Sequence, residues 1–188
     1  MLVDTNVLYP VRLADLVLSS VDDGLFDLCV SDHLLDEIER VLVDDKGLPA
    51  DKAREFRDAV QANASVHVDE SQYGSVREQL DGPDPDDLWH LAAAIAAGAD
   101  AIITANTSDY VKATIPPELN PVEVVAPDDF FERPALDGLD VDLAATVRRI
   151  SAKLKNPPRS PTEILDGLVQ IGLIKTVALL RSRRLIDE

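Results

Sequence analysis

The sequence is poor in the residue types that build disulfides, zinc clusters and membrane spans. It has one cysteine, Cys29, which excludes an internal disulfide and a multi-cysteine zinc site. Its three histidines, His33, His67 and His90, are scattered along the chain and fall short of a zinc-enzyme ligand set. No apolar run approaches the roughly 18 residues of a membrane span, and charged residues interrupt the first 15 residues, where a signal peptide would be apolar. We therefore expect a cytoplasmic protein with no membrane contact.

Basic residues are also scarce. The 18 lysines and arginines stand against 35 acidic residues, which gives a formal net charge of −17. The imbalance lies in residues 1–133, with a net charge of −19, whereas residues 134–188 carry +2. An acidic surface repels a phosphate backbone, so a basic nucleic-acid-binding face is not expected in the first part. Carboxylates gathered around a divalent cation are different, because the cation reverses the local field.

The remaining pattern alternates between strands and helices. Short apolar runs at 1–3, 26–31, 66–68, 101–104 and 122–125 are typical of buried strands. Helical spacing of apolar residues covers 11–21, 32–43, 50–63 and 84–98. This alternation predicts a three-layer α/β/α domain with a mostly parallel sheet over residues 1–130. Further helical patterns at 139–155, from 160 to near 172, and on to about 184 predict a helical C-terminal extension over residues 131–188.

Acidic residues follow two of the predicted strands. Asp4 comes directly after the first strand, which we expect to end in a loop over Asp4–Asn6, and Asn106 and Asp109 follow the strand at 101–104. Ligands of an open α/β sheet bind outside the carboxyl ends of its strands. Carboxylates that converge there would repel one another unless a hard divalent cation such as Mg²⁺ or Mn²⁺ bound them.

Two helices contribute further acids, each with an alternative explanation. Asp84 and Asp86 at the start of the helix over 84–98 can be a helix cap and first-turn charges rather than ligands, and Asp87 shares this alternative. On the helix over 32–43, Glu37 and Glu39 both flank the apolar stripe, and periodicity does not choose between them. His90 lies among alanines, so we expect it to pack rather than to bind a ligand, and Cys29 is expected in the core.

Four segments carry a recognisable pattern. They are LVDTNVLYP, SDHLLDEIERVL, DPDDLWHLAAAIAAGADAIITANTSDY and, in the tail, LKNPPRSPTEILDGLVQIGL. The first three, in this order and spacing, resemble the PIN domain of VapC-type toxins from bacterial toxin–antitoxin pairs, and the fourth resembles a helical extension of one branch of that family. The resemblance covers about residues 1–130 and implies a Mg²⁺- or Mn²⁺-dependent endoribonuclease. It also implies an RNA substrate, a cognate antitoxin and a homodimer as partners.

The resemblance also implies a set of site residues. The motif acids correspond to Asp4, Glu37 and Asp87, and in the last block Asp109 is the expected ligand because Asn106 is neutral. These four acids would ligate the metal, Glu37 would orient or deprotonate the attacking water, and two amides would position water and phosphate. The candidate catalytic residues are therefore Asp4, Asn6, Glu37, Asp87, Asn106 and Asp109. With no histidine in the motif positions, a metal-free ribonuclease mechanism is disfavoured.

Two other functions are compatible with parts of this pattern. A phosphatase of the haloacid-dehalogenase type also begins with an aspartate after its first strand, but it needs Asp-x-Asp and this chain has Asn6 at the third position. A PIN-like fold retained only as a binding module is the non-enzymatic alternative. Metal titration separates the second alternative from a nuclease, because a mere scaffold would not bind Mn²⁺ tightly.

Overall fold

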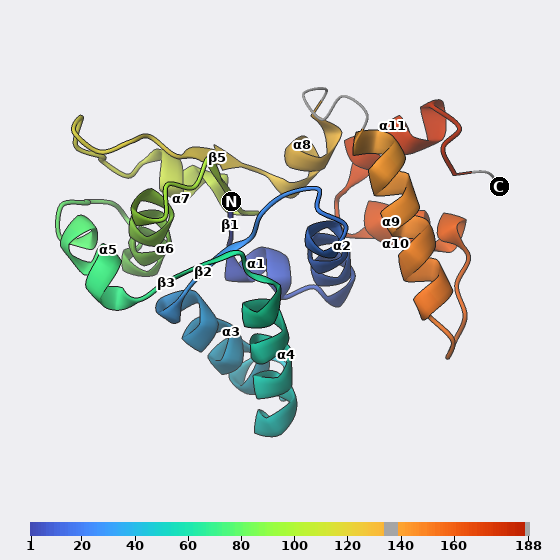
Figure 1. Ribbon diagram of the computed structural model, residues 1–188, viewed down its shortest axis with the longest axis horizontal. Helices are drawn as coiled ribbons and strands as arrows, with labels where there is room; N and C mark the ends of the chain where they lie inside the picture. The colour runs from blue at the N-terminus through green and yellow to red at the C-terminus, as the bar shows by residue number, and fades with distance from the viewer. Residues whose placement is uncertain (134–138, 187–188) are drawn as a thin grey trace. The chain divides into compact units, whose positions relative to one another are not determined.

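The computed structural model of the protein describes residues 1–133 and 139–186, and the chain forms two compact units (Figure 1). The first, here called the sheet unit, comprises Met1–Tyr9 and Asp27–Ala126. The second, the helical unit, comprises Pro10–Phe26 and Pro127–Glu188. Residues 10–26 thus group with the C-terminal helices, although they lie within the range predicted for the α/β domain. The predicted division at residue 130 stays a prediction.

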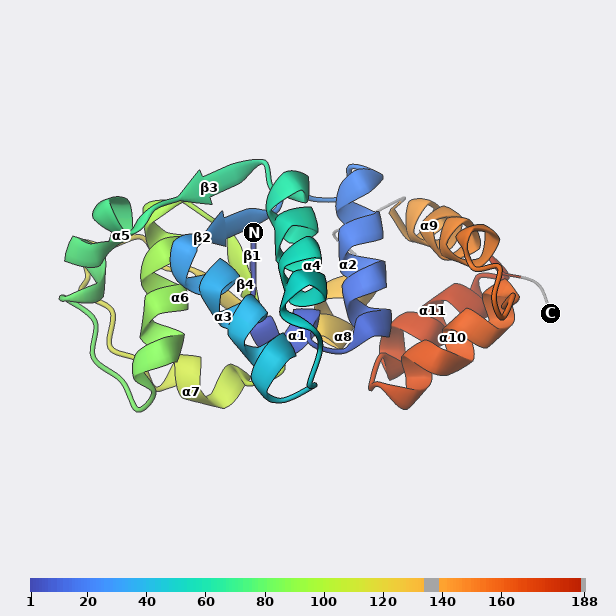
Figure 2. The same cartoon turned by 90° about the horizontal axis from the view of Figure 1, so that it is seen from below.

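The sheet unit contains five parallel strands in the order β3-β2-β1-β4-β5. Helices flank this sheet, as expected for the predicted α/β/α class, which is confirmed (Figure 2). The strands are β1 (Leu2–Val3), β2 (Cys29–Ser31), β3 (Val66–Val68), β4 (Ala101–Ile103) and β5 (Glu123–Val125). The helices are α1 (Thr5–Leu8), α3 (Asp32–Asp44), α4 (Ala50–Asn63), α5 (Glu70–Arg77), α6 (Pro85–Ala96) and α7 (Thr107–Val111).

The strand order reverses at β1, and this reversal creates the place for a site. Leu2 of β1 pairs with Cys29 of β2 on one side and with Ile102 of β4 on the other. The Asp4 amide then donates to the Ile103 carbonyl at 3.0 Å, which holds the carboxyl ends of β1 and β4 together. In doubly wound sheets, ligands bind outside the carboxyl ends of the strands at such a switch point.

Local sequence explains where the longer helices begin and end. The Ser31 hydroxyl caps α3 by accepting from the Leu34 amide, and Asp84 caps α6 ahead of Pro85 in the first turn. After α6, Gly98 adopts φ +63°, a left-handed conformation that glycine adopts without strain. The expected loop over Asp4–Asn6 is wrong, because α1 begins at Thr5 with Asp4 as its cap. A four-residue helix is too short to show periodicity.

The core of the sheet unit lies between the strands and the buried faces of the helices. Leu2 and Ile102 are fully buried, and the small residues Ala92–Ala94 of α6 let that helix pack closely. Cys29 lies in this core as predicted, and burial raises the pKa of its thiol to about 11.

The helical unit consists of α2 (Val11–Asp22), α8 (Pro127–Glu132), α9 (Leu139–Lys153), α10 (Pro161–Gln170) and α11 (Ile174–Ser182). The predicted capping box at the start of α10 is present, since Ser160 and Glu163 each accept from the other's backbone amide. The core of the unit includes Leu143, Val147, Leu168 and Leu180. Among the described helices of both units, none combines the length and apolar character that crossing a bilayer requires.

Candidate active site at the carboxyl edge of the sheet

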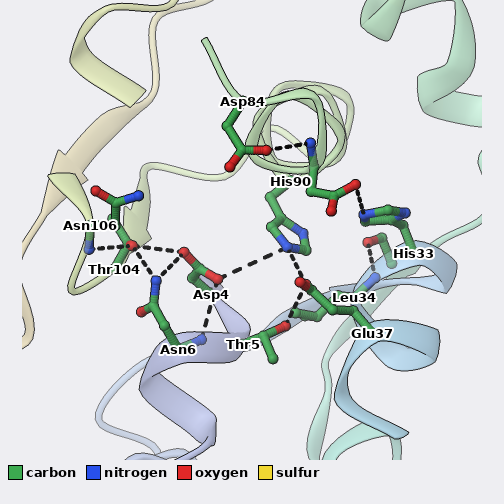
Figure 3. Close-up of polar contacts among 12 residues, drawn as sticks. Asp4, Thr5, Asn6, His33, Leu34, Glu37, Asp84, His90, Thr104 and Asn106 are labelled. Carbon is green, nitrogen blue, oxygen red and sulfur yellow. Dashed lines mark hydrogen bonds and ion pairs between the residues drawn. The ribbon is translucent and has the colours of Figure 1, made fainter. Parts of the chain in front are cut away.

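Asp4 is the centre of a hydrogen-bond network at the ends of β1 and β4 (Figure 3). It is only 4 % exposed. Its Oδ2 atom accepts from Asn6 Nδ2 and from the Thr104 hydroxyl, both at 2.7 Å, and from the Tyr110 hydroxyl at 3.2 Å. Among the described residues, its Oδ1 atom accepts one long hydrogen bond of 3.4 Å, from the Asn6 backbone amide, and lies 3.9 Å from His90 Nε2. The carboxylate is thus fixed through one oxygen, while the other is weakly engaged.

Glu37 extends from α3 to the same region. Its Oε2 atom accepts from the Thr5 hydroxyl and contacts His90 Nε2, both at 2.7 Å, and its Oε1 atom lies 3.7 Å from Arg40. Burial alone would raise the pKa of this carboxyl, but the bond and charge of His90 and the bond from Thr5 outweigh burial and lower the pKa to about 2. The structure therefore places Glu37 at the site, whereas Glu39 pairs with Arg54.

Asp87 lies in the first turn of α6, and one of its two carboxylate oxygens lacks a donor among the described residues. Its Oδ2 atom is buried and has no hydrogen-bond partner among the described residues. Burial, with repulsion from Asp4 and Asp84, raises the pKa of Asp87 to about 6. Asp84 itself accepts from the Asp86 amide at 2.9 Å, so the alternative that it caps the helix is confirmed.

Asn106 and Asp109 are connected to Asp4 indirectly, through the Thr104 hydroxyl. The Asn106 amide donates to the Thr104 hydroxyl at 3.0 Å, and Asn106 Nδ2 donates to Asp109 at 2.8 Å. Lys112 forms an ion pair with Asp109 at 3.1 Å. The bond from Asn106, followed by that from Lys112, lowers the pKa of Asp109. Asp109 is therefore linked to Asp4 through two intervening residues, Asn106 by its side chain and backbone amide and Thr104 by its hydroxyl.

Sequence reasoning missed four residues of this site. Thr5 donates to Glu37, and Thr104 and Tyr110 donate to Asp4. His90 is buried as expected, but it also bridges towards Glu37 and Asp4. Burial would lower the pKa of His90, and the neighbouring carboxylates, Glu37 first, outweigh burial and raise it. A signal for His90 did exist, because it lies three residues after Asp87 and so on the same side of α6.

The donor set fits a hard divalent cation. Asp4 and Asp87 repel each other in a partly buried setting, and the Asp87 Oδ2 atom lacks any donor among the described residues. A buried carboxylate oxygen without a partner is costly, and a cation is the group that satisfies it best. Carboxylate and amide oxygens are ligands that Mg²⁺ and Mn²⁺ accept.

Comparison with known families agrees with this geometry. The family model of the PIN domain matches residues 1–108, and the model of the VapC50 C-terminal domain matches residues 127–182. The first match includes every candidate site residue except Asp109. The chain has no significant match among the curated proteins or among the solved structures. The resemblance to a VapC-type PIN domain, inferred from the four sequence segments, is confirmed.

Proposed function

The chain belongs to the PIN-domain family of nucleases, and we propose that it hydrolyses RNA phosphodiester bonds with Mg²⁺ or Mn²⁺ as the toxin of a toxin–antitoxin pair. The match of its C-terminal part to a VapC domain supports the toxin assignment. The observation that carries the metal requirement is the buried Oδ2 atom of Asp87, which has no hydrogen-bond partner among the described residues and lies near the charge of Asp4.

In this proposal Asp4 and Asp87 hold the cation, with Asp109 and Glu37 as the further carboxylates. When bound, a divalent cation supplies a nucleophile from water at neutral pH and neutralises charge on the leaving oxygen. Each protein side chain then has a positioning task. Because Thr104 and its neighbours occupy Asp4 Oδ2, Asp4 Oδ1 is the oxygen available to the metal.

Glu37 has a related division between its oxygens. Thr5 and His90 already occupy Oε2, whereas Oε1 has only the loose 3.7 Å contact of Arg40 among the described residues. Oε1 is therefore the oxygen that would accept a hydrogen bond from the attacking water or contact the cation. Asn6 is committed to Asp4, Thr104 and the Ala105 amide, so its role is to fix the loop geometry at the strand ends. Asn106 positions Asp109 in the same way.

The two alternatives fare less well against these contacts. In a haloacid-dehalogenase-type phosphatase the residue at position 6 acts as a general acid, but an amide bonded to Asp4 and Thr104 has no proton to transfer. A pure binding module has no need for a buried carboxylate that raises the free energy of the fold.

The proposal is tested by incubating the purified protein with RNA in Mg²⁺, Mn²⁺ or EDTA. We expect cleavage only with the divalent ions. Cleavage that persists in EDTA would refute the metal requirement. Tight Mn²⁺ binding without cleavage of any RNA would favour a different substrate.

The partner assignment has its own test. A reading frame beside the gene should encode a short DNA-binding protein whose co-expression suppresses RNA cleavage. Light scattering of the purified chain then tests the homodimer that the family resemblance implies.

A further inference from the structure

A second group of possible metal ligands lies beside the carboxylate site. His33, Glu37 and His90 each offer one ligand atom, and these atoms all lie within 4.8 Å of one another. We propose that the three side chains bind a borderline transition ion, with Zn²⁺ as the representative case. The three histidines are scattered along the sequence, but folding brings His33 and His90 into contact.

The secondary structure places these ligands. His33 and Glu37 are four residues apart on α3 and so share one face of that helix. His90 reaches them from α6, with its ring centroid 5.2 Å from that of His33 and its Nε2 atom 2.7 Å from Glu37 Oε2 (Figure 3). Two helices that pack against each other thus supply two nitrogens and one oxygen.

The hydrogen bonding of the histidines is incomplete without a ligand. His33 Nε2 and His90 Nδ1 are both buried, and neither has a hydrogen-bond partner among the described residues. His90 as a whole is only 2 % exposed. Buried imidazole nitrogens normally have partners, since an unsatisfied one loses its bond to water without compensation. An ion bound to His33 Nε2 would satisfy that nitrogen, whereas His90 would bind the ion through its Nε2 atom and not through Nδ1.

The separations suit a metal ion after small side-chain rotations. Ligands bound at about 2.0–2.2 Å to one ion lie about 3 Å or more apart, so the 2.7 Å contact of His90 with Glu37 needs only a slight expansion. The ion would take the place of the proton shared by these two atoms. Asp86, whose Oδ1 atom lies 4.0 Å from His33 Nε2, adds negative charge nearby.

The donor atoms of the three side chains determine which ion the site prefers. Imidazole nitrogens bind Zn²⁺ and neighbouring transition ions well, whereas Mg²⁺ prefers oxygen ligands. Two histidines and one glutamate are also a set that leaves a coordination position open on Zn²⁺. The group therefore differs in metal preference from the Asp4 and Asp87 carboxylates, although Glu37 borders both.

A different role for the same residues is positioning only. His90 would then hold Glu37 through one bond, and His33 would simply stack on Trp89, whose ring centroid lies 5.8 Å away. This reading predicts no affinity for transition ions beyond that of exposed surface groups.

The chain offers a direct experiment because it has only three histidines. Protein labelled with ¹⁵N in its histidine rings is titrated with Zn²⁺ and, separately, with Mg²⁺. We expect Zn²⁺ to shift ring nitrogens of His33 and His90 and Mg²⁺ to leave them unchanged. His67, which is exposed and pairs with Asp32 at 2.8 Å, is the internal control. Unshifted His33 and His90 signals, or equal shifts with Mg²⁺, would overturn the proposal.

Matched variants complete the test. His33→Gln should weaken Zn²⁺ binding, measured by calorimetry, by at least about tenfold, or about 1.4 kcal/mol, whereas His67→Gln should bind as the wild type does. Circular dichroism verifies the fold of both variants. Equal Zn²⁺ affinity of His33→Gln and wild type would contradict the site. If the wild type binds Zn²⁺ as expected but neither it nor the variants cleave RNA, the result counts against the proposed nuclease function and not against the Zn²⁺ site.

Discussion

The two units differ in net charge and in the partners of their least exposed carboxylates. The sheet unit has 22 acidic and 7 basic residues, a net charge of −15, whereas the helical unit has 13 and 11, a net charge of −2. In the sheet unit, Asp4 is bonded by neutral donors and Asp87 has an oxygen with no donor among the described residues. In the helical unit, Asp23 pairs with Arg149 at 2.9 Å. The Asp87 oxygen that lacks a donor among the described residues, close to the charge of Asp4, marks the place where a cation would bind best.

One pair of threonines makes the comparison concrete. Thr104 donates to Asp4 at 2.7 Å in the sheet unit, and Thr146 donates to Asp23 at 2.5 Å in the helical unit. Both threonines are fully buried. Asp4 is buried too, whereas the Asp23 side chain is 30 % exposed and reaches water. The same bond thus fixes a candidate ligand in one unit and a surface ion pair in the other.

The largest expected effect is that of Asp87→Asn. Loss of this ligand should reduce RNA cleavage by about 100-fold or more, since a bound cation contributes several kcal/mol to such a reaction. Mn²⁺ at a hundredfold excess over Kd should stabilise the wild type by about 2.7 kcal/mol. The variant should gain less stability, and its melting temperature should therefore rise less on addition of Mn²⁺. Without metal the variant should be as stable as the wild type or more so, because repulsion from Asp4 and Asp84 is removed.

Asp84→Asn is the matched control for this prediction. Asparagine retains the cap of α6, so most of the activity and the Mn²⁺ shift should remain. One melting series with and without Mn²⁺ on the three proteins suffices. If Asp87→Asn melts well below wild type without metal yet shifts normally with it, Asp87 is a structural residue.

The next effect separates the two threonines. Thr104→Val should cost about 2 kcal/mol of stability, because it removes a bond to a buried charge, and should also reduce cleavage. Thr146→Val should cost less than about 1 kcal/mol, since water replaces the lost donor, and should leave cleavage intact. Urea denaturation and the RNA assay measure both. Equal losses of stability and activity in the two variants would contradict the different roles given to Thr104 and Thr146.

A smaller effect distinguishes two arginines of the helical unit. Arg149 bonds to Asp22, Asp23 and the Ser19 carbonyl, whereas Arg181 pairs with Asp166 on a well exposed surface. Arg149→Gln should therefore cost about 1 kcal/mol and Arg181→Gln no more than about 0.5 kcal/mol, by denaturation. A larger loss of unfolding free energy for Arg181→Gln than for Arg149→Gln would show that exposed ion pairs contribute most to the stability of the helical unit.

The smallest effect is a pH dependence of the Asp23 cluster. Burial would raise the pKa of Asp23, but the hydrogen bonds from Thr146 and Arg149 outweigh burial and lower the pKa below its ordinary 3.8. Its stabilising contribution is thus complete above about pH 4 and is lost as pH falls through the lower, folded-state pKa. The stability gap between wild type and Arg149→Gln should narrow in acid. A gap that is constant down to pH 2 would mean that Asp23 does not titrate in this way.

These contacts also bear on the basic residues of the tail. Residues 134–188 carry a net charge of +2. Two of their arginines, Arg149 and Arg181, form ion pairs inside the helical unit. Sequence composition counts charges, but it does not show which of them are already neutralised by a neighbour.

Much of the sheet unit was predictable from local patterns. The strands at 66–68 and 101–103 and the capped helices at 32–44 and 85–96 have strong signals in apolar spacing, caps and turn residues. The short helices α1, α5 and α7 were not predicted, because so few turns do not show a periodic stripe. The grouping of residues 10–26 with the C-terminal helices has no local signal either.

The sequence by itself determined which carboxylates are candidates, because Asp4, Glu37 and Asp87 occupy motif positions. Asp4 and Asp87 also lie at a strand end and a helix start. Only the tertiary structure decided how they are used. His90 bonds Glu37 across 53 residues of chain, Thr104 bonds Asp4 across 100, and Asp87 keeps an oxygen without a partner among the described residues. The physical reason is that periodicity reports which face of an element is buried, whereas hydrogen bonds and repulsion between carboxylates depend on distances that only packing sets.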